Sequence, residues 1–279
     1  MDRIGVNGSS QEASRDRHRL RSSHSDDESE LSMEHKYPAR FVLTGDVDWA
    51  SEYCIESYVD TASAHGIVPS LFVTHRSKML ERFAEEGKVE LGIHPNFLAG
   101  TTHGSTIDEI FDHVLALVPN PVALRCHAFF DNSHVAMAAS RRGIRLDSNI
   151  CCHLQENITV LKHWNGVDRL PVFFEDDVHW LLGLDWDFAA HRKTFESAGL
   201  KILNFHPFMW ALNIPDTDYY LRHKQHIATL TKEQADAMRH PGSGSASFLA
   251  QAIEWVQKTG GRFVRLSELP FDAQARIDP

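Results

Sequence analysis

Short apolar runs alternate with amphipathic stretches along most of this chain. From residue 40 onward, runs rich in Val, Leu, Ile and Phe are each followed by a segment with helical spacing, which usually ends at glycine. This alternation is typical of parallel strands connected by helices. The runs predict strands at residues 41–43, 68–73, 89–93, 122–130, 144–150, 200–205 and 263–264.

The spacing between these runs predicts helices, and several of them have recognisable start signals. Ser51 is a suitable N-cap, and residues 106–109 and 231–234 have the capping-box spacing. Residues 158–174 are expected to hold two strands around the turn Asn165-Gly166. The whole pattern predicts an α/β fold, an irregular (β/α) barrel of about seven parallel strands. In such barrels the chemistry lies at the carboxyl ends of the strands.

Residues 1–37 lack this pattern. They include a polar and charged run at residues 22–30, and large apolar residues nearby are sparse. Such a segment cannot bury enough apolar surface to offset its loss of conformational entropy. We therefore expect a disordered tail at 1–37 and a barrel domain at 38–279.

Composition narrows the possible partners and the compartment. The formal net charge is -10 in 279 residues, which argues against nucleic acid or an anionic membrane as the main partner. No stretch approaches the roughly 18 apolar residues of a membrane helix, and no signal-peptide pattern is visible. The four cysteines lack metal-site spacing and read as reduced core thiols. A cytoplasmic protein is expected, whereas the oligomeric state is left open.

Acidic and histidine side chains stand at the predicted ends of the first and third strands. Asp46 and Asp48 lie two residues apart, so strand alternation would place both carboxylates on one face. His94 follows the third strand, and His103 lies in the next loop. Two close carboxylates repel unless a cation separates them, and imidazole is a common zinc ligand. Solvated aspartates and core histidines are the alternative readings.

Three later strand ends carry a similar set of side chains. Arg125 and His127 share a face at residues 122–130, where a buried arginine needs an acidic partner such as Asp46 or Asp48. Residues 175–177 (EDD) follow an apolar run, and His206 follows residues 200–205. A histidine at such a place could act as a general acid, although a solvated turn and a core histidine also fit.

In this order, the residues resemble the polysaccharide deacetylase family, the metal-dependent sugar N-deacetylases with a NodB-type domain. The resemblance covers residues 40–269. Residues 44–48 (TGDVD) match the first motif, His94 the second, Arg125 the third, Asp177 or Asp176 the fourth, and residues 203–206 the fifth. The chain departs from the family by spacing its aspartates as Asp-Val-Asp and by having Leu98 where a second histidine is expected. The strings GIHPNF and FEDDVH resemble the WbmS-like branch, associated with bacterial surface polysaccharides.

The resemblance implies a reaction and a role for each residue. A divalent ion, zinc or similar, would be held by Asp48, His94 and His103. Asp46 would be the general base, paired with Arg125, and His206 the general acid, oriented by Asp177. The substrate would be an acylated, N-acetylated sugar or surface-polysaccharide precursor. Aromatic residues that could stack on a sugar are Trp49, Phe97, Trp180 and Trp210.

Two other functions remain open on the sequence. The missing histidine at position 98 allows a metal-independent amidohydrolase acting on a small amide or ureide. A catalytically inactive carbohydrate-binding barrel is the third reading, although an idle buried aspartate pair would only destabilise the fold. The metal content of the purified protein would distinguish the metal-dependent deacetylase from the metal-independent amidohydrolase. Catalytic turnover would distinguish both enzymes from the inactive binding barrel.

The tail analysis gives a first prediction. Deleting residues 1–37 should leave the thermal stability and the activity nearly unchanged, because this segment has no core-forming pattern. Thermal unfolding of the two proteins measures this. A loss of more than about 2 kcal/mol would show instead that the tail packs on the barrel.

Overall fold

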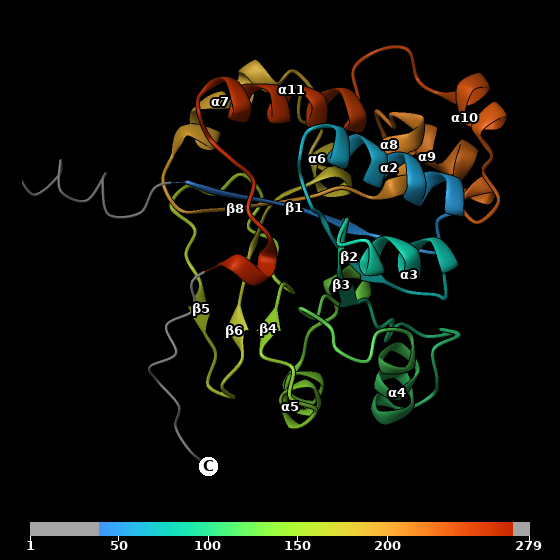
Figure 1. Cartoon of the computed structure of the whole chain (residues 1–279), viewed down its shortest axis with the longest axis vertical. Coiled ribbons are helices and arrows are strands. Elements are labelled where there is room, and N and C mark those ends of the chain that lie inside the picture. The colour runs from blue at the N-terminus through green and yellow to red at the C-terminus, as the bar shows by residue number, and fades with distance from the viewer. Residues whose placement is uncertain (1–38, 270–279) are drawn as a thin grey trace, which may run out of the picture. The chain divides into compact units, whose positions relative to one another are not determined.

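The computed structural model describes residues 39–269 of this chain. The predicted tail, residues 1–37, lies outside this range. Within it, five strands form one parallel sheet in the order β3-β2-β1-β8-β7 (Figure 1). The strands are β1 (Arg40–Asp46), β2 (Ser70–Val73), β3 (Glu90–Ile93), β7 (Val172–Glu175) and β8 (Leu200–Asn204).

Single bridged residues extend this sheet toward a ring. Leu124 pairs in parallel with Ile93 of β3 on one side and with Asp147 on the other, and Cys151 pairs with Val172 of β7. Between them lies a small sheet of β4 (Leu146–Asp147), β6 (Asp168–Arg169) and β5 (Leu161–Lys162), in that order. The predicted irregular (β/α) barrel is confirmed. The hairpin predicted around Asn165-Gly166 is also present, because β5 and β6 pair in antiparallel orientation on either side of it.

Three predicted strands are shorter than expected, and of residues 144–150 only the two-residue β4 pairs. Residues 122–130 contribute only the bridged Leu124, and the chain then turns through a 3-10 segment, His127–Phe129. Ala128 and Phe129 have positive φ, which directs the backbone away from the ring and ends the pairing. Near the C-terminus only Phe263 pairs, with Phe41 of β1.

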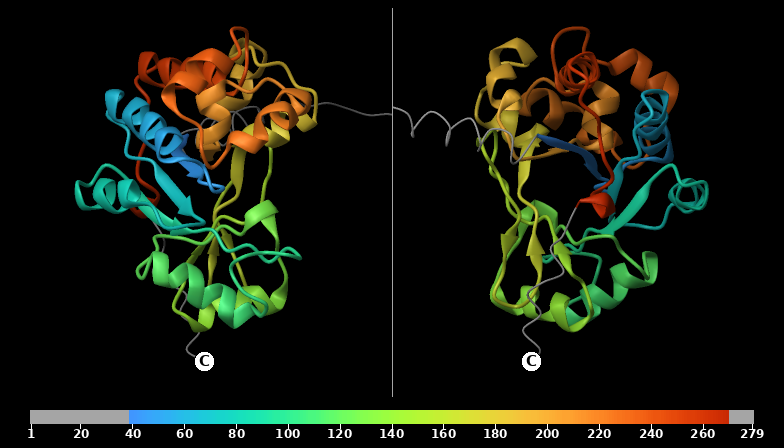
Figure 2. Two further views of the ribbon diagram at one scale, coloured as in Figure 1. Left: turned by 90° about the vertical axis from the view of Figure 1, so that its right-hand side faces the viewer. Right: turned by 60° about the vertical axis from the view of Figure 1, so that its left-hand side comes forward.

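Helices lie outside the strands (Figure 2). Helix α2 packs on α8, which also contacts α11 and α10, and α4 packs on α5. The start signals hold: Ser51 caps α2, and capping boxes open α4 and α10. The helices are α2 (Glu52–Ala64), α3 (Lys78–Glu85), α4 (Ile107–Leu117), α5 (Ser133–Arg141), α6 (Asp176–Leu181), α7 (Phe188–Glu196), α8 (Pro207–Leu212), α9 (Thr217–His223), α10 (Lys232–Met238) and α11 (Ser245–Lys258).

Aromatic packing fixes the side of the barrel that carries β7 and β8. The ring of Phe174 in β7 stacks on Phe248 of α11 at 4.5 Å between centroids and on Phe205, just after β8, at 5.1 Å. All three side chains are fully buried. This tight packing holds the carboxyl ends of β7 and β8 in place. The polar side chains that follow the two strands are therefore expected to have fixed positions.

Across residues 39–269, the helices are all too short or too polar to cross a lipid bilayer.

The close approach of β3 to β2 gives a second prediction. A Cβ added at Gly92 would lie 2.7 Å from the Phe72 ring and 2.9 Å from the Ala123 carbonyl oxygen. Gly92→Ala should therefore lower the free energy of unfolding by about 1–3 kcal/mol, because neither neighbour can move freely. Chemical denaturation measures the change. Gly242→Ala is the control, since its Cβ would meet only the end of the His240 side chain, and an equal loss in both variants would contradict the prediction.

Candidate metal centre and active site

The polar residues predicted at strand ends come together at the carboxyl end of the barrel. Asp46 is the last residue of β1, His94 follows β3, and Glu175 is the last residue of β7. Arg125 and His127 follow the bridged Leu124, and His206 follows β8. This is the end at which (β/α) barrels carry their active sites.

Asp48 reaches this end of the barrel through an unusual turn. Strand β1 ends at Asp46, and Asp48 and Trp49 both have positive φ, 44° and 58°. Strand alternation therefore does not position Asp48, contrary to the sequence argument. The carboxylates nevertheless face the same imidazole, because His94 Nδ1 lies 3.9 Å from Asp46 Oδ1 and His94 Nε2 lies 3.2 Å from Asp48 Oδ1. Consecutive left-handed residues other than glycine are strained, a feature often found at functional sites.

Asp48, His94 and His127 form a group that could hold a metal ion. His127 Nδ1 lies 3.0 Å from Asp48 Oδ1, and the His94 and His127 rings meet edge to face at 5.5 Å. One potential ligand atom from each of the three residues lies within 4.8 Å of the others. Two imidazoles and a carboxylate are a common donor set for zinc, and they leave a coordination position open.

His94 supplies the observation that tests this fit. Its side chain is 1 % exposed, and within residues 39–269 neither ring nitrogen makes a hydrogen bond of good geometry, although Nε2 lies 3.2 Å from Asp48 Oδ1. Leaving buried polar atoms unpartnered costs about 1–3 kcal/mol each, so native proteins rarely keep them without a ligand. The residues present therefore fit a bound divalent cation.

The structure does not place His103 in this group. The His103 ring is buried, its Nδ1 accepts a hydrogen bond from the Asn96 N–H at 3.1 Å, and it stacks on His113 at 4.7 Å. Trp49 contacts His103 on one side and His127 on the other, at 5.7 and 5.3 Å between ring centroids. Of the two histidines, His127 and not His103 lies in the group of potential ligand atoms, although His103 Nε2 is also buried without a hydrogen-bond partner among residues 39–269. The sequence signal for His127 was present, since it shares a strand face with Arg125.

Arg125 and Asp46 form the expected ion pair. Arg125 is fully buried, and its Nη1 lies 2.8 Å from Asp46 Oδ1. The same nitrogen donates to Thr44 and to Asn204 Oδ1, while Nε and Nη2 donate to the carbonyl and the hydroxyl of Ser148. The guanidinium lies 4.1 Å above the Phe72 ring centre. All these contacts hold the Asp46 carboxylate in one position.

His206 is held by Asp176 and not by Asp177. His206 Nδ1 lies 2.7 Å from Asp176 Oδ1, and the His206 N–H and the Ser245 hydroxyl donate to Asp176 Oδ2. The other ring nitrogen, Nε2, faces Asp48 Oδ2 at 3.5 Å. Because Asp176 is the first residue of α6, its side chain points back to β8, whereas Asp177 is turned one position further around the helix.

The matches to known proteins agree with this geometry. The family model "WbmS-like: Polysaccharide deacetylase" matches residues 43–224, which is more than half of the chain. The chain belongs to this family. Among solved structures, it is similar to a protein of Bordetella bronchiseptica inferred to be a polysaccharide deacetylase involved in O-antigen biosynthesis. The identity is 26 %, with a TM-score of 0.72, over 81 % of this chain and 94 % of the other.

Two more distant deacetylase-type structures also match. A peptidoglycan N-acetylglucosamine deacetylase shares 13 % identity at a TM-score of 0.41, over 85 % of this chain and 94 % of the other. A CE4 esterase of Streptococcus mutans shares 12 % at 0.44, over 87 % and 91 %. No curated protein matches the chain. These two similarities are too weak to carry an argument, so the family assignment depends on the family model and is consistent with the Bordetella structure.

In this deacetylase the surroundings shift the pKa values of Asp46 and His206 in opposite directions. Burial raises the pKa of Asp46, but Arg125, together with His94 and His206, outweighs it and leaves the pKa below its ordinary value. Burial lowers the pKa of His206, but the carboxylates of Asp176, Asp48 and Asp177 together outweigh it and raise the pKa well above its ordinary value. These shifts favour the carboxylate form of Asp46 and the imidazolium form of His206.

The sequence analysis did not single out Asn204, which connects Arg125 to Glu175 by hydrogen bonds. Its Oδ1 accepts from Arg125 and from the Thr44 hydroxyl, and its Nδ2 donates to Glu175 Oε1 at 2.8 Å. Glu175 is 1 % exposed, and burial, followed by the charge of Asp177, raises its pKa well above the ordinary value. The sequence signal for Asn204 was weak: it lies two positions before His206, but its partners become visible only once β1, β7 and β8 are neighbours.

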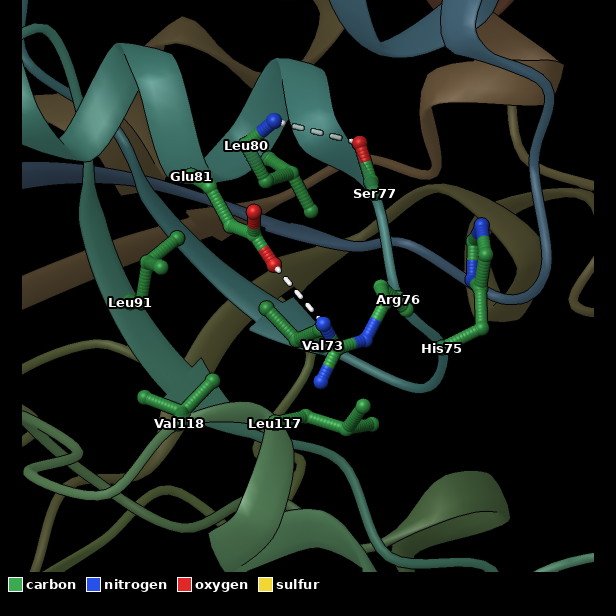
Figure 3. A pocket seen from close by; sticks show the side chains of 9 residues that line it. All are labelled: Val73, His75, Arg76, Ser77, Leu80, Glu81, Leu91, Leu117 and Val118. Carbon is green, nitrogen blue, oxygen red and sulfur yellow. Dashed lines mark hydrogen bonds and ion pairs between the residues drawn. The ribbon is translucent and has the colours of Figure 1, made fainter.

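A separate hollow beside α3 does not belong to the site (Figure 3). An ion pair of Arg76 and Glu81, 3.8 Å apart, lies beside it. None of the site residues lines it. Its apolar lining comes from Val73, Leu80, Leu91, Leu117 and Val118.

The placement of the histidines gives a third prediction. His127→Ala should weaken zinc binding by at least about 10–100-fold, because it removes a ligand and not merely a supporting contact. His103→Ala should retain zinc more tightly than His127→Ala, and the exposed His134→Ala is the control. Calorimetric zinc titration of metal-stripped protein measures this. Full zinc affinity in His127→Ala together with its loss in His103→Ala would restore the ligand set expected from the sequence.

Proposed function

We propose that this chain is a metal-dependent N-deacetylase that removes an acetyl group from an acylated sugar of a surface-polysaccharide precursor. The proposal rests on one observation: three groups of polar side chains lie together at one end of the barrel. These are the Asp48–His94–His127 group, the Asp46–Arg125 pair and the His206–Asp176 pair. The Bordetella relative, described as involved in O-antigen biosynthesis, supports the choice of substrate.

Asp48, His94 and His127 would hold the divalent cation, for which zinc fits the donor set best. When bound, the cation would supply Lewis-acid polarisation of the acyl oxygen and lower the pKa of water in the site. Burial raises the pKa of Asp48, but the adjacent imidazoles of His127, His94 and His206 together outweigh it and leave the pKa well below its ordinary value. Asp48 is therefore ionised, as a ligand must be.

Asp46 would act as the general base. Its carboxylate accepts the proton of the attacking water, and Arg125 holds it in place at 2.8 Å. Asp46, Glu175 and His206 each have a potential ligand atom within 4.8 Å of the others, so the base lies next to the acid. One bound acyl group can therefore contact both residues without a large movement of either.

His206 would act as the general acid. Its Nδ1 is occupied by Asp176 at 2.7 Å, so the proton for the leaving amine comes from Nε2, which faces Asp48 and the centre of the site. Asp176 fixes the ring and favours its protonated form, as an orienting carboxylate does. Bond cleavage then leaves acetate and the free amine of the sugar.

The competing functions fit the structure less well. A metal-independent amidohydrolase would leave both buried nitrogens of His94 without a hydrogen bond of good geometry among residues 39–269, with only the Asp48 carboxylate near Nε2. A barrel that only binds carbohydrate would have no use for opposed pKa shifts at Asp46 and His206, which disfavour the neutral carboxyl and the neutral imidazole.

The assignment of the two aspartates gives a fourth prediction. Asp46→Asn should keep its zinc and lose about two to four orders of magnitude in acetate release, because only the base is removed. Asp48→Asn should lose zinc affinity, with partial rescue of the rate at high zinc concentration. The measurements are zinc titration and acetate release from N-acetylglucosamine oligosaccharides, with thermal unfolding to confirm the fold.

Asp60→Asn is the matched control, because Asp60 is exposed on α2. If Asp46→Asn were the variant that lost zinc, the two roles would be reversed. If neither variant changed the rate or the zinc affinity, the metal-dependent mechanism would be wrong.

A further inference from the structure

Asp177 remains without a role once Asp176 is assigned to His206. Its Oδ1 is buried and has no hydrogen-bond partner within residues 39–269. Burial raises the pKa of Asp177 to about 6; His206 opposes this shift, and Asp176 and Asp48 add to it. The carboxyl group therefore lies among the residues of the centre without contributing to any of the described pairs. An unpartnered buried oxygen of this kind calls for a hydrogen-bond donor from a ligand or from water.

An aromatic pair lies next to this carboxyl group. Trp180 follows Asp177 by three residues in α6, so the two side chains share one face of the helix. The Trp180 ring lies 5.4 Å from that of Tyr220 in α9, at an interplanar angle of 37°. Both residues are half-buried, so part of each ring remains accessible, and α6 and α9 are in contact.

Tyr220 lies within electrostatic reach of the centre and contacts a residue that follows His206. Burial raises the pKa of its hydroxyl, and the next contributions come from the charges of His206, Asp48 and Asp177. Its ring also meets Phe208 at 6.3 Å, and Phe208 lies two residues after His206. The aromatic pair therefore forms a wall beside the acid and the metal group.

A free carboxyl group beside exposed aromatic rings matches the chemistry of a sugar ring. The carboxylate accepts hydrogen bonds from ring hydroxyls, and the aromatic faces cover the apolar C–H face of a pyranose. The Asp177 carboxylate, with Asp176 beside it, makes this side of the site acidic, which disfavours a sugar that carries its own carboxylate.

We propose that Asp177, Trp180 and Tyr220 form a subsite for the ring of an uncharged N-acetylated pyranose, next to the acyl group that is hydrolysed. The position of this subsite beside the amide bond that is cleaved rests on the proposed function, whereas its ability to bind a sugar does not. The subsite also sets specificity, because it favours neutral over anionic sugars.

Calorimetry of the full-length, zinc-loaded protein with the methyl glycosides of N-acetylglucosamine and N-acetylgalactosamine tests the proposal. Wild type should bind at least one of them, and N-acetylneuraminic acid roughly 10-fold more weakly or not at all. Trp180→Ala should raise the Kd about 10-fold through loss of stacking. Asp177→Asn should raise it about 10-fold or more through loss of a charge-assisted acceptor.

Two matched controls separate binding from general damage. Trp164→Ala removes an exposed tryptophan on the β5–β6 turn, and Asp60→Asn an exposed aspartate on α2. Both should bind sugar like wild type. Should Trp180→Ala fail to fold by thermal unfolding, Tyr220→Leu removes the other ring and should raise the Kd in the same way.

The outcomes distinguish the subsite from the reaction. Wild-type Kd values in Asp177→Asn and in the aromatic variants, or no binding of either neutral sugar to wild type, would overturn the subsite even if acetate is released normally. Conversely, sugar binding that depends on Asp177 and Trp180 without any acetate release by wild type would support the subsite and overturn the proposed hydrolysis.

Discussion

The buried Arg125 guanidinium is the group on which the rest of the site depends. A fully buried cation is tolerated only when its charge is balanced and its N–H groups find acceptors. Asp46 supplies the balancing charge, while Thr44, Asn204 and Ser148 supply further acceptors. These four residues come from β1, β8 and the segment after β4. Satisfying one arginine therefore fixes the relative positions of strand ends that are far apart in the chain, and the catalytic residues stand on these ends.

The same arrangement lets similar side chains carry different roles. Asp46 and Asp48 are two residues apart, yet Asp46 faces a permanent cation and Asp48 faces three imidazoles, those of His94, His127 and His206. His94 is left without hydrogen-bond partners among the described residues, whereas His206 is anchored by a carboxylate. A ligand needs a free lone pair and an acid needs a stabilised proton. The environment, and not the residue type, thus decides which histidine suits which task.

Local patterns were enough to predict the barrel and the end of it at which most of the candidate site residues gather. Asp46, Asp48, His94, Arg125 and His206 all lie where the strand-end rule places them, because each follows a buried apolar run directly. The rule could not choose between His103 and His127, since that choice depends on how the loop after β3 folds back over Trp49. Nor could it choose between Asp176 and Asp177, because one residue of helical phase decides which carboxylate meets His206. Asn204 was missed because its role appears only when β1, β7 and β8 are neighbours.

The actual position of His103 still connects it to the metal group, through Trp49. Asp48 and Trp49 occupy strained left-handed conformations, which persist only where the surroundings hold them. The Trp49 N–H donates to the Thr74 hydroxyl at 3.0 Å, and its ring is contacted by His103 and His127. His103 is in turn fixed by its hydrogen bond with Asn96 and its stacking on His113. A residue first expected to bind the cation thus supports the turn that aims Asp48. Both a ligand and a support of this kind would weaken metal binding when removed, but only the ligand removes a donor atom, so the size of the loss tells them apart.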